Sequence, residues 1–340
     1  MKFRIRIQAI VLCALLLLPA LALAELRPQG SVNLLEGRTL LISVYLEEEG
    51  ALWQPKDIAH TRKALDIATS YIAKQAATYG HAAELLCDAD DLRYTIQYEG
   101  AYRESRAESS DFNATVMELI RKEVPLDDLL ARYQTDSYGF ICLLSNTGSS
   151  YALPYYSSYG DDDYDELCVV YLYDSYSSAS VYESVPTYAH ELLHLFGAVD
   201  LYTPFAEDGV TNAVVRYVEQ TAPDELMFTT YESDGSASDT SISQTLSDIT
   251  LYSVGLIDEP DVLAQFPSLR RENVAAFSDQ TGLLGDESAD PWSSLWDELL
   301  NGSAAPWSSL WDGLPASEGT PDEPLPGSLL VSMGLGSTRE

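Results

Sequence analysis

The residues with the clearest chemical spacing are His190, Glu191 and His194, which form the pattern H-E-x-x-H. Side chains four residues apart lie on one face of a helix, so the two imidazoles are placed to bind one metal ion. Zn²⁺ is the ion typical of this pattern, and the glutamate beside the first histidine is placed to take a proton from water. The chain has four histidines in all, which disfavours an ordinary amphipathic helix as the explanation.

A catalytic zinc site normally takes three protein ligands, so a third residue is needed. Gly197 follows His194 by three residues, where a glycine ends a helix and turns the chain back, and Asp200 follows three residues later. Glu219 is the alternative third ligand, as in peptidases that take a glutamate from a later helix, but the asparagine that usually precedes that ligand is missing. We therefore favour Asp200. His60 and His81 lie far upstream and are interpreted as surface or core residues.

The stretch from His190 to Asp200 reads H-E-L-L-H-L-F-G-A-V-D. It resembles the zinc-binding motif of the metzincin metallopeptidases, with aspartate in place of the last histidine, and is most similar to the snapalysin-like branch. Tyr202, two residues after Asp200, and Met227, preceded by Glu-Leu, stand at the positions of that branch's tyrosine and methionine turn. The chain departs from the branch in the 26 residues that separate Asp200 from Met227, which are an unusually long connection.

The resemblance implies roles for several residues. Met227 would form a floor under the zinc, and Tyr202 would stabilise the oxyanion, with Tyr231 a weaker candidate because Thr229 stands where other metzincins have their tyrosine. An ordinary core methionine is the alternative for Met227. An antiparallel edge strand beside the active-site helix would bind a protein or peptide substrate in extended form, and residues 149–156 are the candidate, with a tyrosine-rich surface loop as the alternative.

The elements that must position these residues follow from hydrophobic periodicity, which predicts a mixed α/β (α+β) fold. Alternating or continuous apolar runs predict four strands, at residues 39–45, 92–98, 139–144 and 167–173. Helical spacing predicts three helices, at residues 56–78, at 116–133 with a break at Pro125, and from about Val181 through the zinc-binding motif. The resemblance adds a mostly parallel sheet and a small C-terminal subdomain.

Composition excludes several classes of protein. The 340 residues include 53 Asp and Glu against 19 Lys and Arg, a formal net charge of −34, which excludes a nucleic-acid binder driven by phosphate attraction. From Tyr133 to Val215 there is no Lys or Arg, but there are twelve Asp and Glu and thirteen Tyr, so we expect an acidic cleft. Outside the first 24 residues there are three cysteines, which are too few for a disulfide-stapled scaffold and leave at most one disulfide and a free thiol.

The ends of the chain differ from its middle. Residues 1–24 have a basic start, an apolar run and a small-residue end at Ala24, which predicts a signal peptide and a secreted, extracellular protein with no membrane span after cleavage. We expect a catalytic domain over residues 25–260 and an acidic Ser/Gly/Pro-rich tail over 261–340. The tail carries two PWSSLWDxL repeats, at 291–299 and 306–314, whose tryptophans and leucines share one helical face and predict docking helices.

The sequence thus predicts a secreted zinc-dependent endopeptidase in which Glu191 activates the attacking water. One rival hypothesis is a catalytically idle metzincin-fold protein that binds a partner through its tryptophan-repeat tail. Another is a purely structural zinc site, which would take four protein ligands. The intact Glu191 favours the enzyme.

Overall fold

A computed structural model of the chain describes residues 30–270, except for 33, 49, 88, 100–109, 157–164, 176–180 and 207. The expected signal peptide and the tail repeats lie outside the described residues. Within the described ranges, no helix combines the length and the apolar character needed to cross a bilayer.

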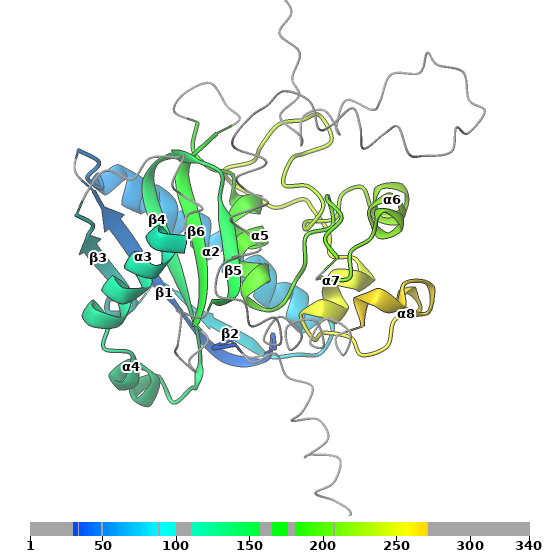
Figure 1. Cartoon of the computed structure of the whole chain (residues 1–340), viewed down its shortest axis with the longest axis horizontal. Helices are drawn as coiled ribbons and strands as arrows, with labels where there is room; N and C mark the ends of the chain where they lie inside the picture. Colours follow the sequence, from blue (N-terminus) through cyan, green and yellow to red (C-terminus); the bar gives the residue numbers. More distant parts are fainter. Residues whose placement is uncertain are drawn as a thin grey trace, which may run out of the picture. The chain divides into compact units, whose positions relative to one another are not determined.

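The centre of the fold is a six-stranded sheet in the order β2-β1-β4-β6-β5, with β3 paired to the second half of β1 (Figure 1). Every pairing is parallel except that of β5 with β6, so β5 forms an antiparallel edge. The strands are β1 (Gly37–Glu47), β2 (Ala83–Leu86), β3 (Arg93–Gln97), β4 (Ser137–Gly148), β5 (Tyr151–Tyr156) and β6 (Asp165–Asp174). This mixed, mostly parallel sheet confirms the predicted fold class.

Both faces of the sheet are covered by helices, which explains why its central strands are apolar on both sides. Alternate residues of each strand enter opposite cores, and in β4 Ile141 and Leu143 face one core while Phe140 and Leu144 face the other. The first core is closed by α2 (Pro55–Thr78) and α5 (Val185–Leu195), and the second by α3 (Ser110–Glu123) and α4 (Leu126–Tyr133) (Figure 1).

The predicted elements are present with shifted ends. The helix expected from about Val181 begins at Val185, because Ser184 caps it and the preceding residues pair with β6 instead. The short strand β2 and a 3₁₀ turn, η1 (Asp90–Leu92), were not predicted. Cys87, Cys142 and Cys168 are all buried, and none of these three described cysteines forms a disulfide, although the sequence left one open.

A smaller helical region follows the H-E-x-x-H motif and consists of α6 (Asn212–Thr221), α7 (Asp248–Ser253), α8 (Val262–Gln265) and the 3₁₀ turn η3 (Pro267–Leu269). It packs into the same core as α2 and α5. Ser268 donates a hydrogen bond to the carbonyl of Gly209 at 2.7 Å, and Phe266 stacks edge-on against Tyr217 of α6. The packed region therefore extends to Arg270, past the boundary that we expected near residue 260.

A buried glutamate ties the start of the described chain to the sheet. Glu166, at the beginning of β6, is 1% exposed and accepts the backbone N–H of Val32 at 3.0 Å. Ser31 accepts the N–H of Glu166 through its side chain and the N–H of Tyr138 through its carbonyl. Burial raises the pKa of Glu166 to about 9, although the hydrogen bond from Val32 opposes the shift. The carboxyl is therefore protonated in the fold at neutral pH.

Candidate metal centre

The helix α5 carries the predicted zinc-binding motif and begins at a defined cap. The side chain of Ser184 accepts the N–H of Thr187. Pro186 lies in the first turn, where a backbone N–H would have no acceptor within the helix. The helix packs against α2, β5 and β6. His190 and Glu191 are buried on it, at 6% and 4% exposure. The motif thus lies inside the protein instead of on a solvated helix face.

The end of α5 is shaped by Gly197, whose φ of 91° is left-handed and suits a residue without a side chain. The N–H of Gly197 reaches the carbonyl of His194, and the N–H of Ala198 reaches the carbonyl of Leu193, which are the two bonds of a Schellman motif. This turn sends the chain back beside the helix. It brings Asp200 to the two histidines, as the sequence argument for Gly197 requires.

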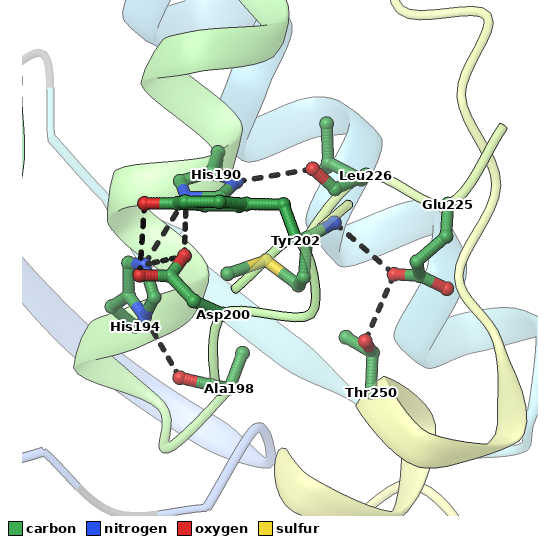
Figure 2. A network of polar contacts seen from close by, with 9 residues as sticks. His190, His194, Ala198, Asp200, Tyr202, Glu225, Leu226 and Thr250 are labelled. Atoms are coloured by element: carbon green, nitrogen blue, oxygen red, sulfur yellow. Dashed lines mark hydrogen bonds and ion pairs between the residues drawn. The ribbon is translucent and has the colours of Figure 1, made fainter. Parts of the chain in front are cut away.

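Three ligand atoms from His190, His194 and Asp200 converge (Figure 2). The Oδ1 atom of Asp200 lies 3.1 Å from Nε2 of His190 and 3.2 Å from Nε2 of His194. The two Nε2 atoms are 3.2 Å apart. Among the described residues, this is the one group of three or more His, Cys, Asp or Glu side chains with a metal-binding arrangement.

The hydrogen bonds of the two Nδ1 atoms determine whether each Nε2 atom carries a proton or a lone pair. Nδ1 of His190 lies 3.0 Å from the carbonyl oxygen of Leu226, and Nδ1 of His194 lies 2.8 Å from that of Ala198. A carbonyl only accepts, so each Nδ1 carries the proton, and in the neutral rings each Nε2 presents a lone pair. In that state three electron pairs point at one another, and a cation between them, either a proton or a metal ion, removes their repulsion.

The donor set fits zinc. Two imidazole nitrogens and one carboxylate oxygen are typical zinc ligands, and carbonyl-bound Nδ1–H groups are the usual outer partners of zinc-binding histidines. Tetrahedral ligands at the usual zinc distances of about 2.0–2.1 Å stand about 3.3 Å apart, close to the separations found here. Three ligands are one fewer than a closed structural site takes, so the described residues leave a position for water or substrate.

The ionisation of the cluster follows from the same contacts. Burial lowers the pKa of both histidines, but it is outweighed by the contacts with Asp200 together with Glu191 for His190 and with Ala198 and Asp208 for His194. The pKa values of both histidines are therefore raised. Burial raises the pKa of Asp200, but the two histidines outweigh it and hold that pKa well below its usual range. Protons and a metal ion therefore compete for this cluster.

Glu191 is buried next to the cluster. Its Oε2 atom is buried with no hydrogen-bond partner in the structure, which is unusual for a polar atom in a protein interior. Burial raises the pKa of Glu191 to about 8, with His190 lowering it and Asp200 and Glu183 raising it. A carboxyl group with a pKa near neutrality and a free oxygen is suited to accept and return a proton.

The remaining predicted residues fall in different places. The Tyr202 hydroxyl donates to Oδ2 of Asp200 at 3.1 Å, and its ring is 42% exposed, 6.3 Å from the His190 ring (Figure 2). Met227 is fully buried, and its carbonyl accepts the N–H of Leu201. The N–H of Tyr231 donates to the side-chain oxygen of Thr229.

The alternative ligands lie elsewhere. Glu219 is on α6, outside the three-residue metal-binding group. His60, on α2, stacks on Tyr182 with 3.9 Å between ring centroids, and His81 faces Glu36 at 3.8 Å. The partners that sequence reasoning missed are the carbonyls of Leu226 and Ala198, because a backbone carbonyl leaves no mark in the amino-acid pattern.

The predicted edge strand is present as β5. It pairs antiparallel with β6 from Tyr151 opposite Val169 to Tyr156 opposite Asp165, and it contacts α5. β6 is its one strand neighbour in the described sheet. Its outer backbone groups are therefore placed to pair with an extended chain beside α5.

Comparison with known proteins gives distant likenesses only. No family model and no curated protein sequence matches the chain. Among solved structures, metalloproteinase-II from Bacteroides fragilis is similar over 65% of this chain and 53% of its own, with 13% identity and a TM-score of 0.33. OgpA from Akkermansia muciniphila is similar over 63% and 60%, with 13% identity and a TM-score of 0.32. The chain thus spans little more than half the length of these proteins, and the assignment of its site rests on geometry.

Proposed function

We propose that this protein is a secreted, zinc-dependent endopeptidase. The observation that carries the proposal is the convergence of three lone pairs from His190, His194 and Asp200 within 3.2 Å, beside a buried carboxyl group with a free oxygen. The H-E-x-x-H-x-x-G-x-x-D pattern and the Met227 turn support a metzincin of the snapalysin-like branch. The pattern of residues 1–24 supports secretion.

His190, His194 and Asp200 would hold the ion, and a zinc ion bound there supplies Lewis-acid polarisation of a carbonyl and a lowered pKa for water. Glu191 accepts a proton from the attacking water on its free carboxyl oxygen and later gives it to the leaving amine. Tyr202, whose side chain is exposed and whose hydroxyl donates to Asp200, would stabilise the developing oxyanion.

The substrate is a protein or peptide bound in extended form. β5 offers its outer edge to the substrate backbone, which needs no particular side chain and suits an endopeptidase. The tail repeats would bind a docking partner, and nucleic acid is excluded as a partner by the net charge of −34.

The variant Glu191→Ala tests this proposal. The purified chain should still bind about one zinc ion, because Glu191 is no ligand, and should lose peptide hydrolysis by at least about a thousandfold. Cleavage of a peptide library, measured with and without a chelator, gives the wild-type reference. Near-normal turnover by the variant removes Glu191 as the base, and a wild type that cleaves nothing favours the idle binding protein.

A further inference from the structure

Glu225 is a fully buried carboxylate two residues before Met227, and Leu226 and Met227 form the methionine turn. Its Oε1 atom accepts the N–H of Met227 at 3.2 Å and the hydroxyl of Thr250 at 2.8 Å, and its Oε2 atom accepts the N–H of Ser247. Three donors from two separate segments thus converge on one side chain. A buried carboxylate is costly unless it is hydrogen-bonded in this way.

The two segments are the methionine turn and the start of α7. Their backbones also pair directly, since the N–H of Leu226 reaches the carbonyl of Thr245 at 2.9 Å and the N–H of Thr245 reaches that of Asp224. The buried side chain of Glu225 adds its three hydrogen bonds to these backbone pairs. It therefore fixes the position of the turn relative to the helical region behind it.

The turn carries two carbonyls that reach the metal centre. The carbonyl of Leu226 accepts Nδ1–H of His190 at 3.0 Å (Figure 2). The carbonyl of Met227 accepts the N–H of Leu201, next to Asp200, at 2.9 Å. Figure 2 shows the chain of contacts from Thr250 through Glu225 to the turn and on to His190. Two of the three ligands therefore depend on the position of one short segment.

We infer that Glu225 is a positioning residue for the metal centre, acting through the carbonyls of Leu226 and Met227 on His190 and Asp200. The inference rests on the metal site of the proposed function. The Leu226 carbonyl holds the proton of His190 on Nδ1 and so directs the lone pair of Nε2 at the ion. If the turn shifts, the Leu226 carbonyl no longer holds the proton on Nδ1 of His190, and it no longer fixes the orientation of the His190 ring.

Glu225→Gln is the sharpest variant, because it has the same shape but replaces one accepting oxygen with an NH₂ group. The amide oxygen of the glutamine still accepts hydrogen bonds. Its NH₂ group, however, faces the N–H of either Ser247 or Met227, and because both groups are donors that hydrogen bond is lost. Asp224→Asn is the matched control, because it also removes one negative charge, from an exposed side chain at the neighbouring position. Thr250→Val removes one of the three donors and keeps the shape.

The measurement is metal affinity on the full chain at 10 °C, by competition between the protein and a chelator for Zn²⁺ and for Co²⁺, with folding verified by circular dichroism. We expect Glu225→Gln to weaken the affinity for both ions by about 10- to 100-fold, the usual effect of losing an outer partner. Its Co²⁺ absorption bands should shift, and the ¹⁵N resonances of the His190 ring should report a mixture of tautomers. Thr250→Val should weaken affinity by about threefold or more, and Asp224→Asn should match the wild type.

A folded Glu225→Gln with wild-type affinity and Co²⁺ spectrum overturns the inference, since a carboxylate that only stabilises the fold would lower the melting temperature and leave the bound ion unchanged. If Glu225→Gln does not fold, Thr250→Val decides: an affinity equal to the wild type overturns the inference, and a weaker one supports it. A wild type that binds metal but cleaves no peptide contradicts the proposed peptidase and leaves this inference intact.

Discussion

Replacing the buried Glu166 with glutamine should make the protein more stable at neutral pH and not at acidic pH. The wild-type carboxyl has a pKa of about 9 in the fold, against an ordinary value of 4.5. Between these two values the folded state holds a proton that the unfolded state has lost. The stability that this proton on Glu166 contributes is therefore fully present below about pH 4.5 and is lost as pH rises toward 9.

The size of the effect follows from linkage. Each pH unit in this range costs about 1.4 kcal/mol, so between pH 5 and pH 7.5 the wild type loses about 3 kcal/mol through Glu166 alone. Glutamine keeps a carbonyl oxygen for the N–H of Val32 and has no proton to lose in this range. The other buried carboxyl groups are common to both proteins and cancel in the difference between them.

The assay is urea unfolding of wild type and Glu166→Gln at pH 5 and pH 7.5, with Glu118→Gln, on the exposed side of α3, as the control. The difference in unfolding free energy between variant and wild type should rise by about 3 kcal/mol from the lower to the higher pH. The control should show no such change. A difference for Glu166→Gln that is the same at both pH values refutes the reasoning, because it means that the carboxyl titrates alike in both states.

Three further predictions concern the site and the tail. Asp200→Ala should lower zinc affinity, whereas Glu219→Ala should leave it unchanged, both measured by chelator competition; the reverse result contradicts the ligand assignment. Peptides with Lys beside the scissile bond should have a higher kcat/KM than peptides with Glu, because residues 133–215 contain no Lys or Arg, and a preference that does not shrink as salt rises contradicts an electrostatic origin. Deleting residues 280–340 should leave peptide hydrolysis intact, and loss of folding or activity would show that the tail belongs to the enzyme core.

The sequence was most informative where one residue type fixes a local geometry. Apolar runs predicted β1, β4 and β6, because a strand that enters two cores is apolar on both faces, and Gly197 predicted the left-handed turn that brings Asp200 back. The start of α5 was placed four residues too early, because apolar periodicity continues into residues that pair with β6. β2 was missed because four residues give too short a pattern.

Contacts made by backbone atoms were beyond sequence reasoning. The carbonyls of Leu226 and Ala198 orient the two histidines, yet any residue in those positions offers the same carbonyl. The buried Glu225 was visible only as part of a motif, since its partners Ser247 and Thr250 lie more than twenty residues away. Contacts at such separations come from packing, which the linear pattern does not specify.

The central claim is that His190, His194 and Asp200 bind one catalytic zinc ion. X-ray absorption at the zinc edge, on the purified full chain after metal analysis, tests it most directly. The account predicts about one zinc per chain, with two imidazole nitrogens and carboxylate oxygen in the first shell at about 2.0–2.2 Å and no sulfur. A shell that contains sulfur, four protein ligands with no water, or a chain that binds no zinc when the ion is supplied, would contradict it.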